Sequence, residues 1–396
     1  MIGEFHPPAR ILMGAGPSNV DPRVLLAMAK PLLGHLDPEF IRIMTQLQDL
    51  LRQVFGTKNP LTLPISGTGS AGMEAAFVNA VEPGERVLVC INGFFGERMA
   101  EVAQRCGAHL HTLSIPWGEA FDPAAIQKEL RRFQPKVLAI VHAETSTGVL
   151  QPLEELSGLL RNYPETLLLV DTVTSLGGHP VKVDEWGIDI CYAGTQKCLS
   201  SPPGLAPITF SPKAADKIRK RAHKGQSFYF DMNLLEKYWG SERAYHHTAP
   251  VSMNYALLES LRILSEEGLA SRYERHRRNH KALVQGIEAM GLSMFVPEPY
   301  RAWSLNTIRI PQGIDDAQLR KTLLEKYNLE ISSGLGSLRG KIWRVGLMGY
   351  GSSETNVLFF LTALEQALRE QHFEVPRGAA VLAVGQGSIS RTSSLI

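Results

Sequence analysis

Short apolar runs rich in β-forming residues alternate with amphipathic stretches through the first half of the chain. The apolar runs lie at 86–91, 109–115, 136–141, 166–171, 189–194 and 205–210. The stretches between them, such as GERMAEVAQRCG and PAAIQKELRRF, carry apolar residues at helical spacing. Uninterrupted apolar strands that alternate with helices are typical of βαβ units, because helices bury both faces of a parallel sheet. This pattern predicts an α/β fold with a buried, mainly parallel sheet.

The pattern changes after about residue 250. Two long helical stretches follow one another, NYALLESLRILSEEG and SRYERHRRNHKALVQGIEAMG, and no strand is expected among them. Strands return at 292–298, 305–311 and 341–347, separated by helices near 315–326 and 353–370. The second of these helices has an apolar face made of Val357, Leu361, Leu364 and Leu368. We therefore expect connecting helices followed by a smaller α+β domain.

These changes divide the chain into four parts. An N-terminal arm covers 1–20, a large domain with the connecting helices covers 21–285, and a small domain covers 286–375. Residues 376–396 are rich in Gly and Ser and follow a helix that has ended, so they are expected to form a mobile tail. The cationic run RYERHRRNHK, at 272–281, is expected to be a solvated helix face.

Composition narrows the classes of function. Forty-one Lys and Arg against 39 Asp and Glu leave a formal charge of +2, which favours small-molecule partners over nucleic acid or an anionic membrane. The four cysteines, Cys90, Cys106, Cys191 and Cys198, lack paired or metal-binding spacing, so neither a disulfide framework nor a metal site is predicted. No signal peptide or membrane span is visible, and a soluble, cytoplasmic protein is expected.

A glycine-rich turn precedes a helical stretch in SGTGSAGMEAAFVNAV. Gly67, Gly69 and Gly72 match the GxGxxG pattern of dinucleotide sites. Such a site also needs a clear strand before the turn and an acid at the end of the next strand. The preceding segment is interrupted by Pro64, and the next apolar run continues into Asn-Gly without an acid. A nicotinamide-dependent oxidoreductase is therefore disfavoured.

The same turn remains suited to a phosphate. Thr68, Gly69 and Ser70 would expose free N–H groups at the positive end of the following helix dipole. A plain tight turn is the alternative, because small residues alone also favour that conformation.

Asp171 and Lys197 follow two neighbouring apolar runs. Asp171 ends TLLLVD, and Lys197 comes 26 residues later, after one further strand. Ligands of open α/β sheets bind at the carboxyl ends of the strands, so both side chains are expected to face one cleft. An amine that forms a Schiff base, a carboxylate that keeps a pyridine nitrogen protonated, and a helix N-terminus for a phosphate together suit pyridoxal 5′-phosphate.

The segment DTVTSLGGHPVKVDEWGIDICYAGTQKCLSSPPGLAPITFS resembles the cofactor region of the alanine-glyoxylate and serine-pyruvate aminotransferases, which are class-V members of the fold-type I pyridoxal-phosphate enzymes. The similarity extends to GAGPSNV, NPLTLPISGTGSAGMEAA, INGFFGERM, HAETSTGVLQPL, YHHTAPVSMNYAL and WRVGLMG, and covers the chain to about residue 372. It implies a seven-stranded, mainly parallel sheet in the large domain and a homodimer with shared active sites.

The resemblance also implies roles for individual residues. Lys197 would carry the cofactor, and Asp171 would pair with the pyridine nitrogen. Val173 and Phe95 would pack on the two faces of the ring, and Thr145 would approach the 3-hydroxyl.

The phosphate and substrate contacts are implied in the same way. The phosphate would be held by Thr68, Gly69, Ser70 and Gln196, together with Tyr245 and Thr248 of a second subunit. Arg344 would clamp the substrate carboxylate through a bidentate pair, with Gly16 and Ser175 as further substrate-binding residues. Cys198 is expected to be a packing residue rather than a nucleophile.

The implied reaction is a ping-pong transfer of an amino group from alanine or serine to glyoxylate, with Lys197 moving the proton. Two relatives stay open as alternatives: a serine-pyruvate aminotransferase, and an (S)-ureidoglycine-glyoxylate aminotransferase, which is disfavoured by His35 where that relative has glutamine. A cysteine desulfurase is disfavoured because no cysteine follows Cys198. A non-catalytic binding module would not need Lys197, Asp171 and Arg344 together.

Overall fold

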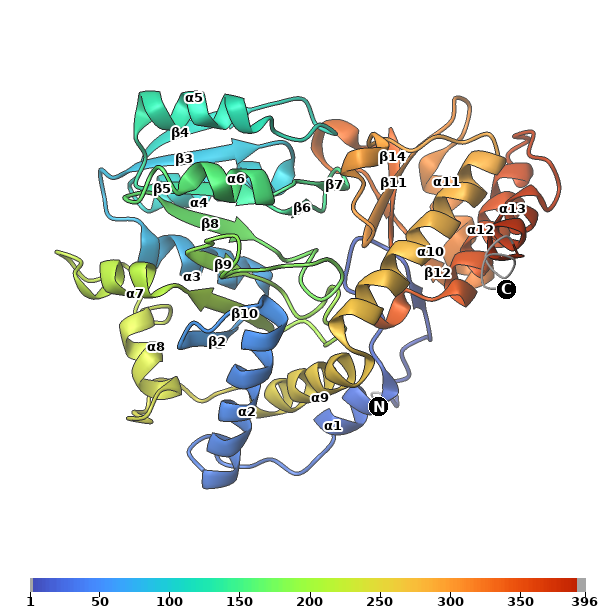
Figure 1. Ribbon diagram of the computed structural model, residues 1–396. Coiled ribbons are helices and arrows are strands. Elements are labelled where there is room, and N and C mark those ends of the chain that lie inside the picture. The colour runs from blue at the N-terminus through green and yellow to red at the C-terminus, as the bar shows by residue number, and fades with distance from the viewer. Residues whose placement is uncertain (1–2, 390–396) are drawn as a thin grey trace, which may run out of the picture.

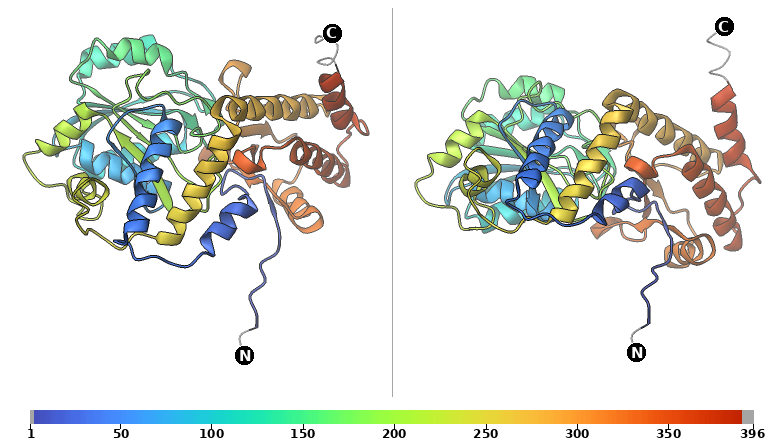
Figure 2. Two further views of the ribbon diagram at one scale, coloured as in Figure 1. Left: turned by 60° about the horizontal axis from the view of Figure 1, so that its bottom comes forward. Right: turned by 90° about the horizontal axis from the view of Figure 1, so that it is seen from below.

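The computed structural model describes residues 3–389, which form two lobes that lie side by side (Figure 1). The larger lobe is built around a seven-stranded sheet, and the smaller lobe, in orange and red, holds the C-terminal elements. Residues 3–10, which precede β1 (Ile11–Leu12), extend away from both lobes (Figure 2). Within residues 3–389 no helix is both long and apolar enough to cross a membrane.

The large sheet has the strand order β2-β10-β9-β8-β5-β3-β4. Its strands are β2 (Leu61–Ser66), β10 (Leu205–Phe210), β9 (Ile190–Tyr192), β8 (Leu167–Asp171), β5 (Val137–Val141), β3 (Arg86–Ile91) and β4 (His109–Ser114). The strand β10 runs antiparallel to β2 and β9, and the other pairings are parallel. The prediction of an α/β fold with a mainly parallel, seven-stranded sheet is confirmed.

The strand β2 corrects one expectation. Pro64 was expected to interrupt the segment before the glycine-rich turn, yet it lies within β2. Because β2 is at the edge of the sheet, the missing N–H of a proline can be accommodated there. The strand β3 continues into Asn92 and Gly93, so no carboxylate stands where a ribose would need one.

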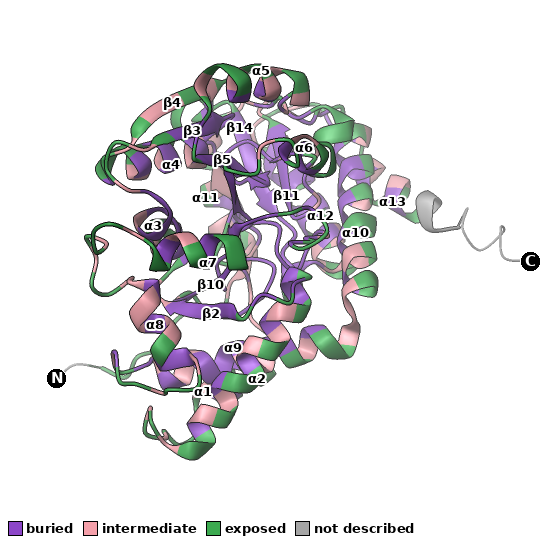
Figure 3. Cartoon of the chain, turned by 60° about the vertical axis from the view of Figure 1, so that its left-hand side comes forward, coloured by how far each residue is buried: buried purple, intermediate pink, exposed green. Residues whose placement is uncertain are grey.

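Helices cover the sheet and bury its side chains. The helices of the large lobe are α1 (Pro22–Met28), α2 (Pro38–Phe55), α3 (Gly69–Ala80), α4 (Phe94–Arg105), α5 (Pro123–Phe133), α6 (Glu154–Leu160), α7 (Pro212–Arg219), α8 (Met232–Trp239) and α9 (Val251–Glu267). The inner strands of the sheet are buried, whereas the edge strand β4 has no buried residue and the outer helices alternate between buried and exposed residues (Figure 3).

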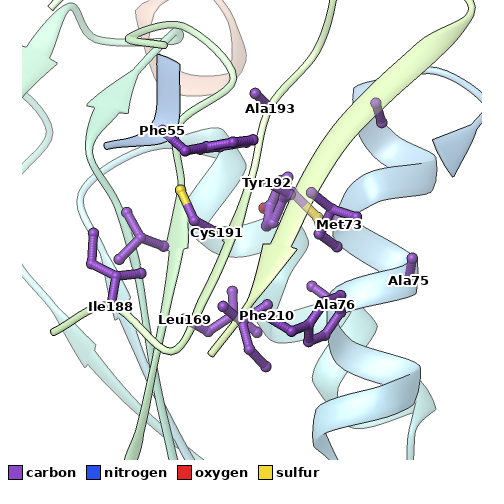
Figure 4. Packing of buried hydrophobic residues seen from close by; sticks show 14 of the residues in the cluster. Phe55, Met73, Ala75, Ala76, Leu169, Ile188, Cys191, Tyr192, Ala193 and Phe210 are labelled. Atoms are coloured by element: carbon purple, nitrogen blue, oxygen red, sulfur yellow. The ribbon is translucent and has the colours of Figure 1, made fainter. Parts of the chain in front are cut away.

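The strand β9 shows why the apolar runs are uninterrupted. Its side chains alternate between the two faces of the sheet, as strand geometry requires. Tyr192 points toward Met73 of α3, whereas Cys191 points toward Phe55 of α2 (Figure 4). Since helices cover both faces, every position of such a strand must be apolar.

The smaller lobe has its own core around a three-stranded sheet of order β11-β14-β13. Its elements are α10 (Leu269–Ala289), β11 (Leu305–Arg309), α11 (Asp316–Tyr327), β12 (Leu329–Glu330), β13 (Ser332–Ser333), β14 (Ile342–Gly346) and α12 (Glu354–Glu370). Leu283 and Ile287 of α10 belong to this core, so the expected domain boundary at 285/286 falls inside a helix. The arm strand β1 pairs in parallel with β12 and so joins the smaller lobe.

The expected strand at 292–298 is reduced to one bridge. Met294 pairs with Ile308 in isolation, and the chain then enters a single 3₁₀ turn at Glu298–Tyr300. Pro297 precedes that turn and cannot donate a ladder hydrogen bond.

The expectation of a mobile tail at 376–396 is wrong for most of that segment. Residues Ala379–Ile389 form α13, which packs against α10 and α12. Ala380 and Val384, four positions apart on that helix, are buried in the small-lobe core. Residues 390–396 lie outside the described part of the chain.

The expectation of a solvated face at 272–281 holds for Glu274, Arg277, Arg278 and Lys281, which are exposed, and is wrong for the other face of the helix. Arg272, His276, Asn279 and His280 of α10 are buried, with side chains at most 7% exposed. Their spacing places them on one face of the helix, from which Arg272 reaches Gly177 O of the large lobe and His276 accepts from the Gly349 N–H of the smaller lobe.

Candidate active site

Lys197 lies in the loop that follows β9, at the carboxyl end of that strand. The residue is 7% exposed, and its Nζ donates a hydrogen bond to the carbonyl oxygen of Ala15 in the N-terminal arm. The arm passes so close that a Cβ on Gly16 would lie 2.6 Å from Nζ. Gly16 also has a φ of +108°, so a larger residue would be strained as well as crowded.

The arm also fixes the backbone around Lys197. The Ser18 N–H donates to Gln196 O at 2.9 Å, and Ser18 Oγ donates to Lys197 O at 2.9 Å. The Ser200 N–H donates to Lys197 O at 3.0 Å. Sequence reasoning missed Ser18 because a contact across 179 positions leaves no local pattern.

Burial makes Lys197 a better nucleophile than an exposed lysine. Burial first, and the nearby positive charge of Arg344 second, lower the pKa of Lys197 to about 8. A substantial neutral fraction near physiological pH is what an amine needs to attack a carbonyl or to accept a proton.

Asp171 ends β8 and is 2% exposed. Its Oδ1 accepts a hydrogen bond from the Val173 N–H at 2.8 Å, and its Oδ2 accepts one from the Tyr192 hydroxyl at 2.7 Å. Burial raises the pKa of Asp171 to about 6, and both hydrogen bonds oppose that shift. Such a buried carboxylate, when ionised, is stabilised by a cationic N–H partner.

Glu144 is a member of the site that sequence reasoning missed. It lies in the short strand β6 (Ala143–Glu144) and is 1% exposed, and burial raises the pKa of this carboxyl group. It accepts hydrogen bonds from the Phe95 N–H at 3.1 Å and from Ser146 Oγ at 2.6 Å. The start of α4 is thereby tied to the site, with Phe95 at its second position. The sequence signal that could have identified Glu144 is its position as an acidic residue in the segment HAETSTG.

The glycine-rich turn forms the N-terminus of α3. Thr68 is the N-cap residue, but its side chain makes no capping hydrogen bond. Thr68 and Ser70 are exposed, whereas Gly69 packs so closely that a Cβ there would lie 3.3 Å from Val173 Cγ2. The N–H groups of the first turn therefore stand beside the loop that follows Asp171.

Gln196 approaches the same place from the other side. Its Oε1 atom is buried and has no hydrogen-bond partner. A Cβ on Gly194 would lie 2.8 Å from that atom. Because the amide oxygen and nitrogen of glutamine are assigned from their partners, this end of the side chain can present a donor to a ligand.

Arg344 extends from β14 of the smaller lobe and is 7% exposed. Its Nε donates to Ser333 O at 2.8 Å and its Nη1 donates to Thr145 O at 3.2 Å, so it joins the two lobes. Burial lowers the pKa of Arg344 to about 10, and the negative charge of Glu144 opposes the shift. It lines a cavity of about 820 Å³ at the edge of the small-lobe sheet.

Three further residues implied by the resemblance have contacts other than those of the Lys197 cluster. Ser175 is fully buried, with its Oγ 2.9 Å from Nδ1 of His142. Tyr245 is 64% exposed, and its ring lies 5.4 Å from that of His35. Thr248 is exposed as well. Among the contacts described for residues 3–389, the side chains of Ser175 and Tyr245 make none with Lys197, Asp171, Glu144 or Arg344.

The buried cluster itself combines four groups that influence one another. The charges of Asp171, Glu144 and Arg344 all act on Lys197. An amine, two carboxyl groups and a guanidinium in one place suit proton transfer at a carbon beside a carboxylate. No group of three or more His, Cys, Asp and Glu that could hold a metal ion occurs in the part of the chain that the structure describes.

The class-V aminotransferase family model matches residues 11–353, which span both lobes of this site. The chain belongs to the class-V aminotransferases.

Similar members of the family share the whole architecture. A solved alanine-glyoxylate aminotransferase from Nostoc sp. is 49% identical, with a TM-score of 0.92, and the match covers 93% of this chain and 98% of that one. The (S)-ureidoglycine-glyoxylate transaminase of Bacillus subtilis (strain 168) is 43% identical over 96% of this chain and 95% of its own length. The alanine-glyoxylate aminotransferase of Rattus norvegicus is 42% identical over 91% and 88%.

Class-V aminotransferases of this fold depend on pyridoxal 5′-phosphate. The residues present fit that group at both ends. The amide end of Gln196, whose Oε1 atom lacks a partner, and the uncapped turn at Thr68 suit a phosphate. At the other end, the buried carboxylate of Asp171 suits a protonated pyridine nitrogen, and Lys197 is the buried amine.

Proposed function

We propose that this aminotransferase moves the amino group of a small amino acid, alanine or serine, to glyoxylate. The observation that carries the proposal is the buried cluster of Lys197, Asp171 and Arg344 at the junction of the two lobes. Relatives named for alanine and glyoxylate, at 42% and 49% identity, support the choice of substrates. A cytoplasmic location agrees with four cysteines that are all free and buried.

In the proposed mechanism the bound cofactor supplies an aldehyde that takes up the amino group and a ring that accepts electrons from Cα. Arg344 binds the α-carboxylate of the substrate through its planar guanidinium and so orients the Cα–H bond. Lys197 removes the proton from Cα and holds it at Nζ until it is returned on the product side. Asp171 keeps the ring nitrogen protonated, and burial keeps bulk water from competing with both proton transfers.

Other side chains would hold the cofactor in register. Val173, whose methyl groups pack on the glycine-rich turn, would contact one ring face and Phe95 the other. Thr145, which bonds Thr174 through its hydroxyl, would approach the 3-hydroxyl. Gly16 would leave room for substrate beside Lys197, where any side chain would collide.

The phosphate would be bound by the turn and by a neighbouring subunit. We assign it to Thr68, Gly69, Ser70 and Gln196 of one protomer and to Tyr245 and Thr248 of another. Exposed apolar side chains support a homodimer: Leu25, Leu26, Leu32, Leu36 and Tyr245 are each at least 45% exposed. They come from α1, from the segment before α2 and from the loop after α8, and the contact between His35 and Tyr245 joins two of these regions. Apolar side chains gathered in this way mark association surfaces.

The experiment that tests the function is a set of half-reactions. Alanine, serine, glutamate or (S)-ureidoglycine is added to the cofactor-loaded enzyme, and the loss of the visible absorbance is followed in each case. Rapid loss with alanine or serine, and recovery with glyoxylate, is the expected result. A response to glutamate alone would overturn the substrate assignment, and a response to (S)-ureidoglycine alone would replace it with the activity named for the B. subtilis relative.

A further inference from the structure

A partly buried ion-pair cluster lies next to the Lys197 loop, where α9 meets α10. Glu267 ends α9, and its carboxylate receives Arg272 Nη1 at 2.7 Å and Arg275 Nε at 2.6 Å. Arg272 is only 3% exposed. The two arginines lower the pKa of Glu267 to about 2, so this carboxylate is ionised at physiological pH even though burial opposes it.

The remaining donors of Arg272 go to two loops of the active site. Its Nη2 donates to Cys198 O at 2.7 Å, and its Nε donates to Gly177 O at 2.9 Å. Cys198 directly follows Lys197, and Gly177 lies in the loop that begins after Asp171. A guanidinium holds its donors in a fixed plane, so Arg272 sets the spacing between the two loops.

Arg275 and His276 connect the same cluster to the smaller lobe. Arg275 Nη1 donates to Gly349 O at 2.9 Å, and the Gly349 N–H donates to His276 Nε2 at 2.9 Å. Gly349 lies three residues beyond β14, the strand that carries Arg344. Through its two arginine partners, Glu267 therefore connects the backbone at Cys198, next to Lys197, with the backbone at Gly349, which follows the strand of Arg344.

We propose that Arg272 is a positioning residue for Lys197, which fixes the carbonyl of Cys198 and so the direction in which the Lys197 side chain leaves the backbone. The proposal rests on the proposed role of Lys197. Arg272 touches neither substrate nor cofactor. It acts through two carbonyl oxygens that a shorter or more flexible donor cannot reach together.

The test compares Arg272→Lys and Arg272→Gln with Arg277→Gln. Arg277 lies on the same helix, pairs with Glu274 and is 44% exposed. Arg277→Gln is therefore the control: it also removes an ion-paired arginine from this helix, but one that does not contact the active-site loops. A lysine keeps the positive charge and can still pair with Glu267, but it lacks the planar set of N–H donors that reaches both carbonyl oxygens. We expect Arg272→Lys to lower kcat about tenfold with KM changed less than twofold, because a misdirected base affects the proton transfer more than binding.

Two readouts separate positioning from stability. In the cofactor-free protein, hydrogen exchange of the peptide covering 195–201 should become faster in both Arg272 variants and stay unchanged in Arg277→Gln. In the loaded protein, the pKa of the visible absorbance should shift in the Arg272 variants alone. A merely structural role would lower the melting temperature and leave exchange, absorbance pKa and kcat of the folded fraction at wild-type values, which would overturn the proposal.

A further variant keeps the inference testable if Arg272 cannot be replaced. Glu267→Gln leaves all the arginine side chains in place and removes the charge that orients them, so it should accelerate exchange of 195–201 in the same direction. Wild-type exchange and wild-type kcat in folded Glu267→Gln would also overturn the proposal. A wild-type protein in which borohydride traps no cofactor on Lys197 would overturn the proposed function as well, whereas unchanged Arg272 variants of a working enzyme overturn only this inference.

Discussion

The two ends of the cofactor site are built differently. Lys197 and Asp171 themselves are at most 7% exposed, and the hydrogen-bonding partners we describe for both side chains come from the same chain. Around the glycine-rich turn, Thr68 and Ser70 are exposed, and Tyr245 is 64% exposed. The chain thus encloses the ring end, where charge and proton transfer need a dry environment, and leaves the phosphate end open. In the proposed dimer, the chemistry would therefore be local to one chain, whereas cofactor retention would be shared.

Removing the amine at the ring end should have the largest effect. We expect Lys197→Ala to lower the transamination rate by at least ~10³-fold, because the nucleophile and the general base are lost together. Borohydride reduction followed by peptide mapping should find no cofactor attached at this position. Lys182→Ala, an exposed lysine paired with Glu185, is the control and should retain full activity.

Asp171→Asn should have the next largest effect. The amide oxygen can still accept the hydrogen bond of the Val173 N–H, and the amide NH2 can donate to the Tyr192 hydroxyl oxygen, but the neutral side chain cannot stabilise a positive charge on the ring nitrogen. A fall in kcat of about 10²–10³-fold is expected, with the cofactor still bound. Steady-state kinetics at saturating cofactor measure it, and wild-type kcat in this variant would mean that the ring lies elsewhere.

Burial of Lys197 should also be visible in the stability of the cofactor-free protein. The pKa is about 8 in the folded state and 10.5 for the ordinary side chain, so between these values the unfolded chain binds more protons than the folded one. Stability should therefore rise with pH from about 8 to 10.5, and the full cost of burying the charge is present below pH 8. We expect Lys197→Met to be more stable than wild type at pH 7 by up to about 3 kcal/mol. Urea unfolding at several pH values tests this, and a difference that does not shrink above pH 8 would contradict it.

Arg344 lies at the ring end but comes from the smaller lobe, and its loss should affect binding more than chemistry. Arg344→Lys is expected to raise the KM for the oxo acid ~10–100-fold, which corresponds to ~1.5–3 kcal/mol, because an ammonium cannot form the bidentate pair. Arg309→Lys on the neighbouring strand β11 is the control, since that side chain is exposed over Phe295. Equal KM values in the two variants would show that Arg344 does not bind the substrate carboxylate.

The sequence predicted the ring end better than the parts that hold it in place. Apolar runs buried on both faces gave the strands, and the rule that ligands bind at strand ends indicated Asp171 and Lys197. Glu144, Ser18 and Arg272 were missed, because each acts on a backbone group far away in the sequence. The pattern of residue types along a short stretch of sequence cannot predict such long-range contacts.

The two wrong expectations at the C-terminal end have the same origin. The run at 272–281 was expected to be solvated from its charge, yet Arg272 is buried because Glu267 and two carbonyl oxygens compensate its burial. The glycine-rich segment was expected to be mobile, yet the small lobe offers Ala380 and Val384 an apolar surface. In both cases tertiary partners decided the outcome over composition.

The phosphate end should give the smallest effect and the sharpest test of the comparison. Thr248→Ala is expected to weaken cofactor binding about tenfold, the loss of one hydrogen bond to a charged group, with kcat unchanged at saturation. Mixed dimers of Thr248→Ala and Lys197→Ala then distinguish the two ways of supplying this hydroxyl. If it comes from the partner, the one site with a working lysine also has an intact Thr248, so it should bind cofactor with wild-type affinity. If the hydroxyl acts within its own protomer, that site stays about tenfold weaker, and the phosphate end would be as local as the ring end.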